Sequence, residues 1–222
     1  MELVGQPVIK LPEEYYTLDF ETNGLPKGED VSAVDIIEVA WTLSKDGVIT
    51  KQFSKLANPG APLPPKIIEV TGITDALLVG AVTPLEAARE GLTELIKSDL
   101  PIVGHNIIGF DRFFIDKYAK LLGLPKVDVE RYIDTAALFK TFRRGHRAKT
   151  TAYELPKGSF FGWAVNVLER SWAVDAVKFN LDAAVGYLAV PQFGIETERH
   201  RALYDVILTS RVLEALRIEM GL

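Results

Sequence analysis

The chain has no cysteine among its 222 residues, and it has only three histidines and two methionines. Without cysteine, the protein forms no disulfide and has no thiolate nucleophile and no cysteine-ligated zinc or iron–sulfur site. Any bound metal ion must therefore be held by oxygen or imidazole ligands.

Long apolar runs are also missing. No apolar segment approaches the roughly 18 residues that a transmembrane helix requires, and Met1-Glu2-Leu3 does not open a basic and hydrophobic leader. The sequence therefore predicts no membrane partner, no secretory signal and a soluble, cytoplasmic protein.

The overall composition is that of an ordinary globular protein. Hydrophobic residues make up 48% of the chain and charged residues 25%, which excludes general disorder and fibrous architectures. A length of 222 residues lies between one average domain and two. We therefore expect one α/β domain over residues 1–222.

The charge is unevenly distributed. The whole chain carries a net charge of −5, but the segment 140–178 has eight basic residues against three acidic ones. That segment is therefore at +5 and the remainder at −10. An acidic body with one basic insert fits a metal-dependent enzyme that acts on phosphates, because clustered carboxylates need cations nearby. A solvated loop is the alternative interpretation of the insert.

The first part of the chain reads as an antiparallel meander. Alternating apolar residues predict a strand over 15–21, a second strand fits 35–43, and a hairpin turn at 46–47 leads into a third strand over 48–53. The proline-rich segment 58–65 is predicted to be a loop.

The rest of the chain alternates between helices and short strands. Thr83 and Glu86 predict a capping box that starts a helix at Pro84. Further helices are expected over 110–122, 135–140, 181–189 and 199–218, and short strands over 101–106 and 132–134. This order predicts a mixed α/β sheet flanked by helices rather than a doubly wound parallel sheet.

Two Asp-x-Glu sequences occur in very different contexts. Asp19 and Glu21 lie inside a strongly apolar strand, at positions i and i+2, so both carboxylates leave the same face. Asp128 and Glu130 lie in a segment that reads as exposed loop. Because like charges on a buried strand are costly without a cation, the first pair predicts a metal site and the second does not.

Two more aspartates occupy suggestive positions. Asp111 starts a helix directly after a predicted strand, where α/β sheets place ligands; helix capping is the alternative role. Asp205 lies inside the last helix, five residues after His200, so the two side chains can reach one pocket. For His200 alone, an ordinary surface position is the alternative.

Taken together, three segments resemble the exonuclease motifs of the DnaQ-like superfamily: residues 19–24 (DFETNG), 105–111 (HNIIGFD) and 200–205 (HRALYD). The resemblance extends over about residues 15–215. The histidine five residues before the last aspartate is typical of the DEDDh branch. The other branch has tyrosine four residues before that aspartate, where this chain has Arg201.

The resemblance implies a ribonuclease H-like fold and cleavage of nucleic acid from the 3′ end, releasing nucleoside 5′-monophosphates. It implies that Asp19, Glu21, Asp111 and Asp205 bind two divalent ions. Hard oxygen ligands favour Mg²⁺ or Mn²⁺. His200 is expected to be the general base, because imidazole is the side chain best suited to accept a proton near neutral pH.

The resemblance also implies a pocket for the terminal nucleotide, formed by Thr22, Leu25, Asn106 and Phe110. Core packing is the alternative for Leu25 and Phe110. His105 is a further candidate for substrate binding, and a hydrogen bond within the sheet is its alternative role.

The basic and aromatic insert, at about 141–178, contains none of the three motifs, and the resemblance implies no role for it. It places Arg143, Arg144 and Arg147 among aromatic residues, as in grooves that bind single strands. We therefore hypothesise that these arginines grip the strand upstream of the scissile bond. A helix that packs on the body through its aromatic residues is the alternative.

Three functions remain open. The first and favoured one is an exonuclease acting on single-stranded DNA 3′ ends, including proofreading for a polymerase or service to another replication or repair protein in trans. The second is an exonuclease that trims RNA or short oligonucleotides, which differs in its treatment of the 2′-hydroxyl. The third is a catalytically idle nucleic-acid-binding module of the same fold.

Overall fold

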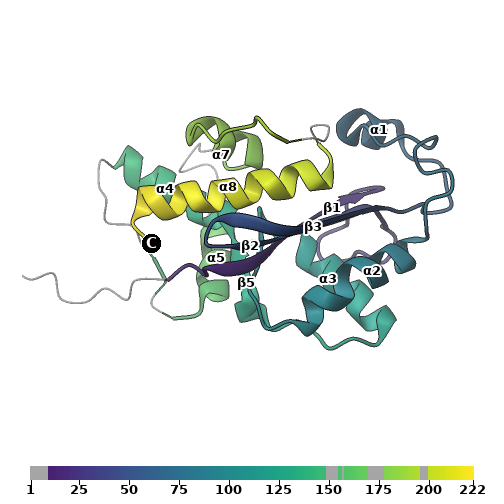
Figure 1. Cartoon of the computed structure of the whole chain (residues 1–222), viewed down its shortest axis with the longest axis horizontal. Coiled ribbons are helices and arrows are strands. Elements are labelled where there is room, and N and C mark those ends of the chain that lie inside the picture. Colours follow the sequence, from purple (N-terminus) through teal and green to yellow (C-terminus); the bar gives the residue numbers. More distant parts are fainter. Residues whose placement is uncertain (1–9, 149–154, 157, 170–177, 196–199) are drawn as a thin grey trace, which may run out of the picture.

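The computed structural model describes residues 10–148, 155–156, 158–169, 178–195 and 200–222. Its centre is a mixed five-stranded sheet with the strand order β3-β2-β1-β4-β5 (Figure 1). The strands are β1 (Glu14–Thr22), β2 (Ile36–Lys45), β3 (Val48–Leu56), β4 (Ile102–Gly104) and β5 (Tyr132–Asp134).

The first three strands form the predicted antiparallel meander. β1 pairs with β2 and β2 with β3, both antiparallel, while β4 and β5 join in parallel. At the β2–β3 turn, Asp46 and Gly47 both have positive φ, 52° and 76°, as a two-residue hairpin of matching twist requires. The predicted mixed sheet, strand meander and turn are confirmed.

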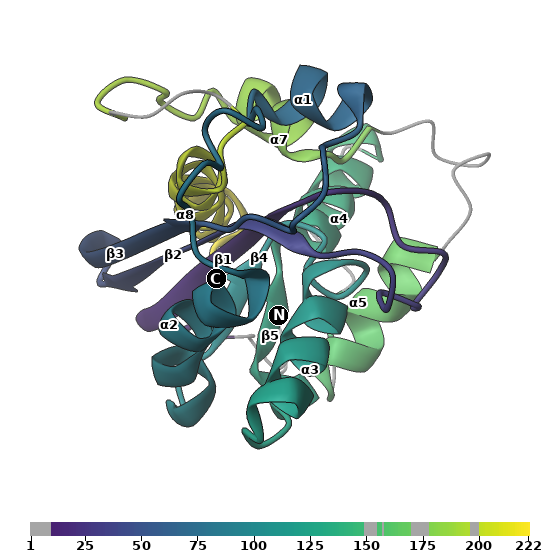
Figure 2. The ribbon, with the colours of Figure 1, turned by 90° about the vertical axis from the view of Figure 1, so that its right-hand side faces the viewer.

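Helices cover both faces of the sheet. In Figure 2, α8 (Ala202–Met220) lies above the sheet, and α2 (Pro84–Lys97) and α3 (Asp111–Leu122) lie below it. Thr83 and Glu86 form the predicted capping box of α2. Gly91 in α2 leaves room for the sheet, because a Cβ there would lie 2.9 Å from the ring of Phe53 in β3 and 3.1 Å from the side chain of Val39 in β2.

β1 shows why both faces need cover. The rings of Tyr16 and Trp41 lie 5.3 Å apart and almost perpendicular to each other, while the hydroxyl of Tyr15 donates to Glu214 of α8 at 2.9 Å. Thr17, on the face of Tyr15, is fully buried. The alternation that predicted this strand is therefore correct, but its polar face is covered by α8 over most of its length.

Three parts of the chain differ from the sequence-based expectation. α4 (Thr135–Arg147) continues beyond residue 140, because Phe139 and Phe142 give its continuation a buried face. α1 (Pro65–Thr71) follows the predicted loop 58–65 and was not expected. α5 (Phe160–Glu169) occupies part of the insert, where a basic groove was the hypothesis and a packed helix the alternative.

Two smaller elements complete the described chain: α7 (Leu181–Tyr187), which packs against α8 and α4, and a 3₁₀ turn, η1 (Val129–Arg131). Within the described residues, no helix combines the length and apolar character needed to cross a bilayer.

Candidate active site

Three carboxylates from distant parts of the sequence meet at one end of the sheet. Asp19, Glu21 and Asp205 each offer an oxygen, and these oxygens all lie within 4.8 Å of one another. Asp19 and Glu21 share one face of β1 because strand side chains alternate. Asp205 lies in the first turn of α8, where its backbone N–H donates to the carbonyl of Arg201 at 3.1 Å. The predicted convergence of these three residues is present.

Asp111 lies beside this group and is held differently. It is the first residue of α3, is only 3% exposed, and its Oδ1 accepts the backbone N–H of Phe20 at 3.3 Å. It is close enough to Asp19 that its charge is the largest electrostatic influence on that carboxyl. The structure thus has three clustered carboxylates and a fourth that is anchored behind them.

The electrostatics of the group are those of a cation site. Burial and the like charges of Asp111, Glu21 and Asp205 raise the pKa of Asp19 well above its usual range. The pKa of Glu21 is raised to about 8 by burial and by the negative charges of nearby carboxylates, which are Asp205, Glu38 and Asp111. The positive charge of Arg201 opposes this shift. Burial likewise raises the pKa of Asp111 to about 8. Hard divalent cations fit this all-oxygen donor set, since they offset the mutual repulsion.

A buried carboxyl shapes the loop that leads to Asp111. Asp134 accepts four backbone N–H groups, those of Asn106, Ile108, Ala136 and Ala137, at 2.9–3.2 Å. It therefore caps α4 and also ties the loop after β4 to that cap. Asn106 adopts a left-handed backbone with φ 70°, so this chain turn is set before α3 begins.

His105 is engaged within the protein. Its Nδ1 lies 2.9 Å from the hydroxyl of Thr135 and its Nε2 lies 2.7 Å from the carbonyl of Phe179. Burial lowers the pKa of this imidazole to about 4. With both ring nitrogens in use, the geometry favours the internal hydrogen-bonding role over the predicted substrate contact.

The other predicted pocket residues differ in exposure. Leu25 is 81% exposed, which argues against the core-packing alternative. Phe110 is half-buried and packs 5.2 Å from Phe114, in keeping with its packing alternative. Thr22 is buried, and its hydroxyl donates to the carbonyl of Gly24 at 2.8 Å, turning the chain after β1.

His200 lies directly before Arg201, the N-cap residue of α8. Its side chain is exposed and its backbone has φ 59°, a conformation that L-residues adopt only when their surroundings demand it. Residues 196–199 lie outside the described part of the chain. Asp205 is five residues further on, one turn into the helix, and belongs to the carboxylate group.

One partner of the site was not assigned to it from the sequence. Glu38 is 1% exposed and its Oε2 lies 2.9 Å from Nε of Arg201 in a buried ion pair. The available signal was its position in β2, where the antiparallel register places it opposite Glu21.

The contacts of the basic insert favour, for part of its length, a packed helix over the hypothesised groove. Arg143 stacks 3.7 Å from the ring of Tyr187, so it packs α7 onto α4. The insert aromatics Phe142 and Phe160 are buried in the main core. These contacts match the alternative, a helix packed through aromatic residues. Trp172 and Tyr153 and the side chain of Arg147 lie outside the described residues.

The second Asp-x-Glu sequence is exposed, as expected. Asp128 caps η1 by accepting the N–H of Glu130 at 3.0 Å. Glu130 accepts a hydrogen bond from Ser159 of the insert. Both side chains belong to exposed residues, so their charges are solvated.

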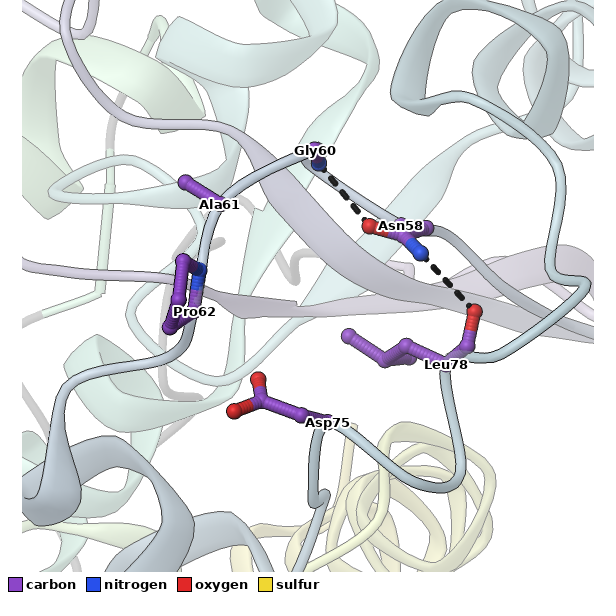
Figure 3. Close-up of a pocket in the computed structure, with 6 residues that line it drawn as sticks. All are labelled: Asn58, Gly60, Ala61, Pro62, Asp75 and Leu78. Carbon is purple, nitrogen blue, oxygen red and sulfur yellow. Dashed lines mark hydrogen bonds between the residues drawn. The ribbon is translucent and has the colours of Figure 1, made fainter.

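An open pocket of about 300 Å³ lies near α1 and contains none of the predicted site residues (Figure 3). Its lining residues are Asn58, Gly60, Ala61, Pro62, Asp75 and Leu78. The amide of Asn58 is used within the chain, because it donates to the carbonyl of Leu78 and accepts from Gly60.

Several solved nuclease structures have a similar fold. The fold matches exonuclease X in complex with 5′ overhanging duplex DNA, with a TM-score of 0.59 and 22% identity over 94% of this chain and 93% of that one. It also matches E. coli exonuclease I in complex with a dT13 oligonucleotide, with a TM-score of 0.66 and 13% identity over 95% of this chain and 42% of the other. At these identities the likeness establishes the ribonuclease H-like fold.

The curated relatives include DNA polymerase III proteins. The chain is 37% identical over 106 residues to DNA polymerase III subunit epsilon of Aquifex aeolicus, covering 48% of this chain and 49% of that protein. It is 36% identical over 146 residues to DNA polymerase III PolC-type of Bacillus cereus, covering 64% of this chain and 10% of that protein. The chain thus spans half or less of these relatives' lengths.

A family model described as "Exonuclease" matches residues 17–160, which is well over half of the chain and includes Asp19, Glu21 and Asp111. The chain therefore belongs to this exonuclease family, within the DnaQ-like superfamily of 3′–5′ exonucleases that its three motifs resemble.

Proposed function

We propose that this protein hydrolyses single-stranded nucleic acid, with DNA favoured, from the 3′ end and releases nucleoside 5′-monophosphates. The observation that carries the proposal is the group of Asp19, Glu21 and Asp205, whose oxygens lie within 4.8 Å of one another. Residues so far apart in sequence have no structural reason to bring repelling carboxylates together. A folded chain keeps such a group where a bound cation offsets the repulsion.

Asp19, Glu21, Asp205 and the adjacent Asp111 would hold two Mg²⁺ or Mn²⁺ ions. Four carboxylates balance the charge of two divalent ions, and oxygen donors suit both metals. When bound, such ions lower the pKa of the attacking water and neutralise charge on the leaving 3′ oxygen. His200 would accept the proton of the attacking water, in the role of general base.

Several residues near the carboxylates are proposed to bind the substrate. Leu25, exposed just after β1, offers an apolar surface on which any terminal base can stack. Thr22, Asn106 and Phe110 lie in the segments that end β1 and precede α3. Their nearness in sequence to Asp19 and Asp111 supports a pocket for the terminal nucleotide.

The arginines of the insert have unequal support as contacts to the upstream strand. Arg143 is committed to Tyr187, so its proposed contact is the weakest of the three. Arg144 lies on α4 in a half-buried position and, with Arg147, remains a proposed contact. His105 is retained only as an internal residue of the site, because its ring nitrogens are already in use.

We propose that the protein acts beside a DNA polymerase, in the cytoplasm. Both of the similar proteins named above are DNA polymerase III components, and the solved neighbours include complexes with DNA. We therefore propose proofreading or trimming of DNA 3′ ends in the service of a replication or repair protein. RNA and short oligonucleotides are the competing substrates.

The decisive experiment uses matched oligonucleotides. The purified chain is incubated with 5′-labelled single-stranded DNA and RNA of one sequence, in Mg²⁺, in Mn²⁺ or in chelator. We expect a ladder that shortens from the 3′ end only when a divalent ion is present, and that forms faster on DNA. If RNA is shortened faster, RNA and not DNA is the preferred substrate. If oligonucleotides bind but are not cleaved in either metal, the protein is a catalytically idle binding module.

A further inference from the structure

The first turn of α8 is fastened to the sheet by one fully buried carboxylate. Oε2 of Glu38 accepts Nε of Arg201 at 2.9 Å and the backbone N–H of Ala202 at 3.1 Å. Oε1 accepts Nη2 of Arg201 at 3.0 Å and the hydroxyl of Ser54 at 2.8 Å. Glu38 thus caps the helix from outside, since Arg201, at the cap position, makes no side-chain cap of its own.

The attachment of α8 through Glu38 lies next to the part of β1 that contains Asp19 and Glu21. In the β1–β2 register, Glu38 stands opposite Glu21 and Ala40 stands opposite Asp19. Ala40 packs against Ala202 of α8, and both are fully buried. The small side chains at this contact allow α8 to approach β2 closely, next to Asp19.

The same attachment leads directly to the third carboxylate. The carbonyl of Arg201 accepts the backbone N–H of Asp205 at 3.1 Å, which is the first hydrogen bond of α8. The side chain of Arg201 is therefore fixed to β2, and its main chain is bonded to Asp205. His200 precedes Arg201 with a left-handed backbone, so its direction depends on the same anchor.

We propose that Glu38 and Arg201 are positioning residues of the exonuclease site, and that their ion pair sets the distance of Asp205 from Asp19 and Glu21. The inference rests on the proposed function of those carboxylates and adds two residues that touch neither the substrate nor the reacting atoms in this role. A two-point guanidinium contact suits the task, because its planar fork fixes orientation as well as distance.

A purely electrostatic role makes a different prediction. Glu38 adds a negative charge near Glu21 and Arg201 adds a positive one. If charge alone mattered, neutralising Glu38 would weaken cation binding and neutralising Arg201 would strengthen it. If position matters, removing either partner weakens binding, because each removal releases the first turn of α8.

The test compares Glu38→Gln and Arg201→Gln with the unaltered chain. Mn²⁺ affinity is measured by calorimetry without substrate, and kcat, KM and Tm are measured beside it. We expect both variants to bind Mn²⁺ about 10 to 100-fold more weakly, the range found when groups that orient metal ligands are removed. We also expect kcat to fall while KM changes little. Because the pair acts as a unit, the double variant should lose no more Mn²⁺ affinity than one single variant does.

A matched control lies at the other end of the same helix. Arg217 pairs with Glu214 at 3.1 Å, and Arg217→Gln is expected to lower Tm without changing Mn²⁺ affinity. Arg201→Lys keeps the charge but loses the fork, so we expect it to restore Mn²⁺ affinity only in part. It also serves as the deciding variant if either glutamine variant fails to fold.

Two results would overturn the proposal in a protein that binds Mn²⁺ and cleaves DNA normally. One is a folded Arg201→Gln variant whose Mn²⁺ affinity is unchanged or tighter. The other is complete restoration of that affinity by Arg201→Lys, which would reduce the pair to a charge effect. Failure of the unaltered chain to bind Mn²⁺ at all would instead remove the proposed function.

Discussion

The chain contains two Asp-x-Glu sequences, and they have opposite fates. Asp19 and Glu21 lie on a strand beneath a helix, where burial and neighbouring carboxylates raise their pKa values. Asp128 and Glu130 lie at an exposed turn, where Asp128 caps the next amide. The same spacing of the same residue types therefore produces a candidate metal site in one place and a solvated turn in the other. The surroundings, not the motif, decide.

The strongest test of this comparison is catalysis. Asp19→Asn removes one ligand charge from the site, and we expect it to lower kcat/KM by about a thousandfold, since metal-assisted charge stabilisation is worth several kcal/mol. Asp128→Asn, the same chemical change in the other pair, should leave kcat/KM within about twofold. The measurement is the rate of 3′ shortening of labelled DNA in Mg²⁺. A reversed ranking of the two variants would show that the wrong pair was assigned.

The pH dependence of metal stabilisation separates the pairs next. Without metal, the folded-state pKa of Glu21 is about 8, above the value of about 4.5 expected when unfolded. Between those values the folded chain binds more protons, so stability contributed by this group falls as pH rises. Divalent ions compete with these protons, so 5 mM Mg²⁺ should raise Tm more at pH 8 than at pH 6, by about 5 °C or more. Asp19→Asn should reduce this difference, and Asp128→Asn should not; equal Mg²⁺ effects at both pH values would contradict the cation site.

In chelator, neutralising Asp19 should make the metal-free protein more stable, whereas removing the Asp128 side chain should make it slightly less stable. Asp19→Asn relieves repulsion within the group, so we expect the metal-free protein at pH 8 to gain about 1–2 kcal/mol in unfolding free energy, and Tm to rise by about 2–4 °C per kcal/mol. Thermal unfolding in chelator measures it. A loss of stability instead would mean that Asp19 is held by favourable contacts and not strained by its neighbours.

The smallest expected effect belongs to the exposed pair. Asp128→Ala removes the cap on the amide of Glu130, and the expected cost is about 0.5 kcal/mol. Chemical denaturation resolves this difference, with Asp128→Asn as the control because asparagine also caps. Exonuclease rate and Mn²⁺ affinity should be unchanged in both variants, and a change in either would connect this turn to the site.

Much of the fold could be predicted from local patterns. The three antiparallel strands, the Asp46-Gly47 turn and the capping box of α2 follow from alternation, turn chemistry and capping residues, all of which act over a few neighbours. α1 was missed because its short proline-led segment derives its stability from a separate small core around Ile73 and Leu78. The continuation of α4 was missed, and a helix such as α5 was expected only as the alternative to a basic groove, because the aromatic residues of both segments pack on distant elements.

The candidate site likewise has features that local sequence determines and features that depend on tertiary packing. The sequence alone determined which chemistry was present, since the absence of cysteine, the paired acids on one strand face and the spacing of His200 and Asp205 depend only on residue type and local geometry. Only the tertiary structure decided that Asp205 joins Asp19 and Glu21 while Asp111 is anchored beside them, that His105 is used internally and that Arg143 packs on Tyr187. It also decided that Glu38 and Arg201 pair beneath the site. The physical reason is that burial and the meeting of charges from distant segments are set by how a helix packs on a sheet, and no local pattern specifies that packing.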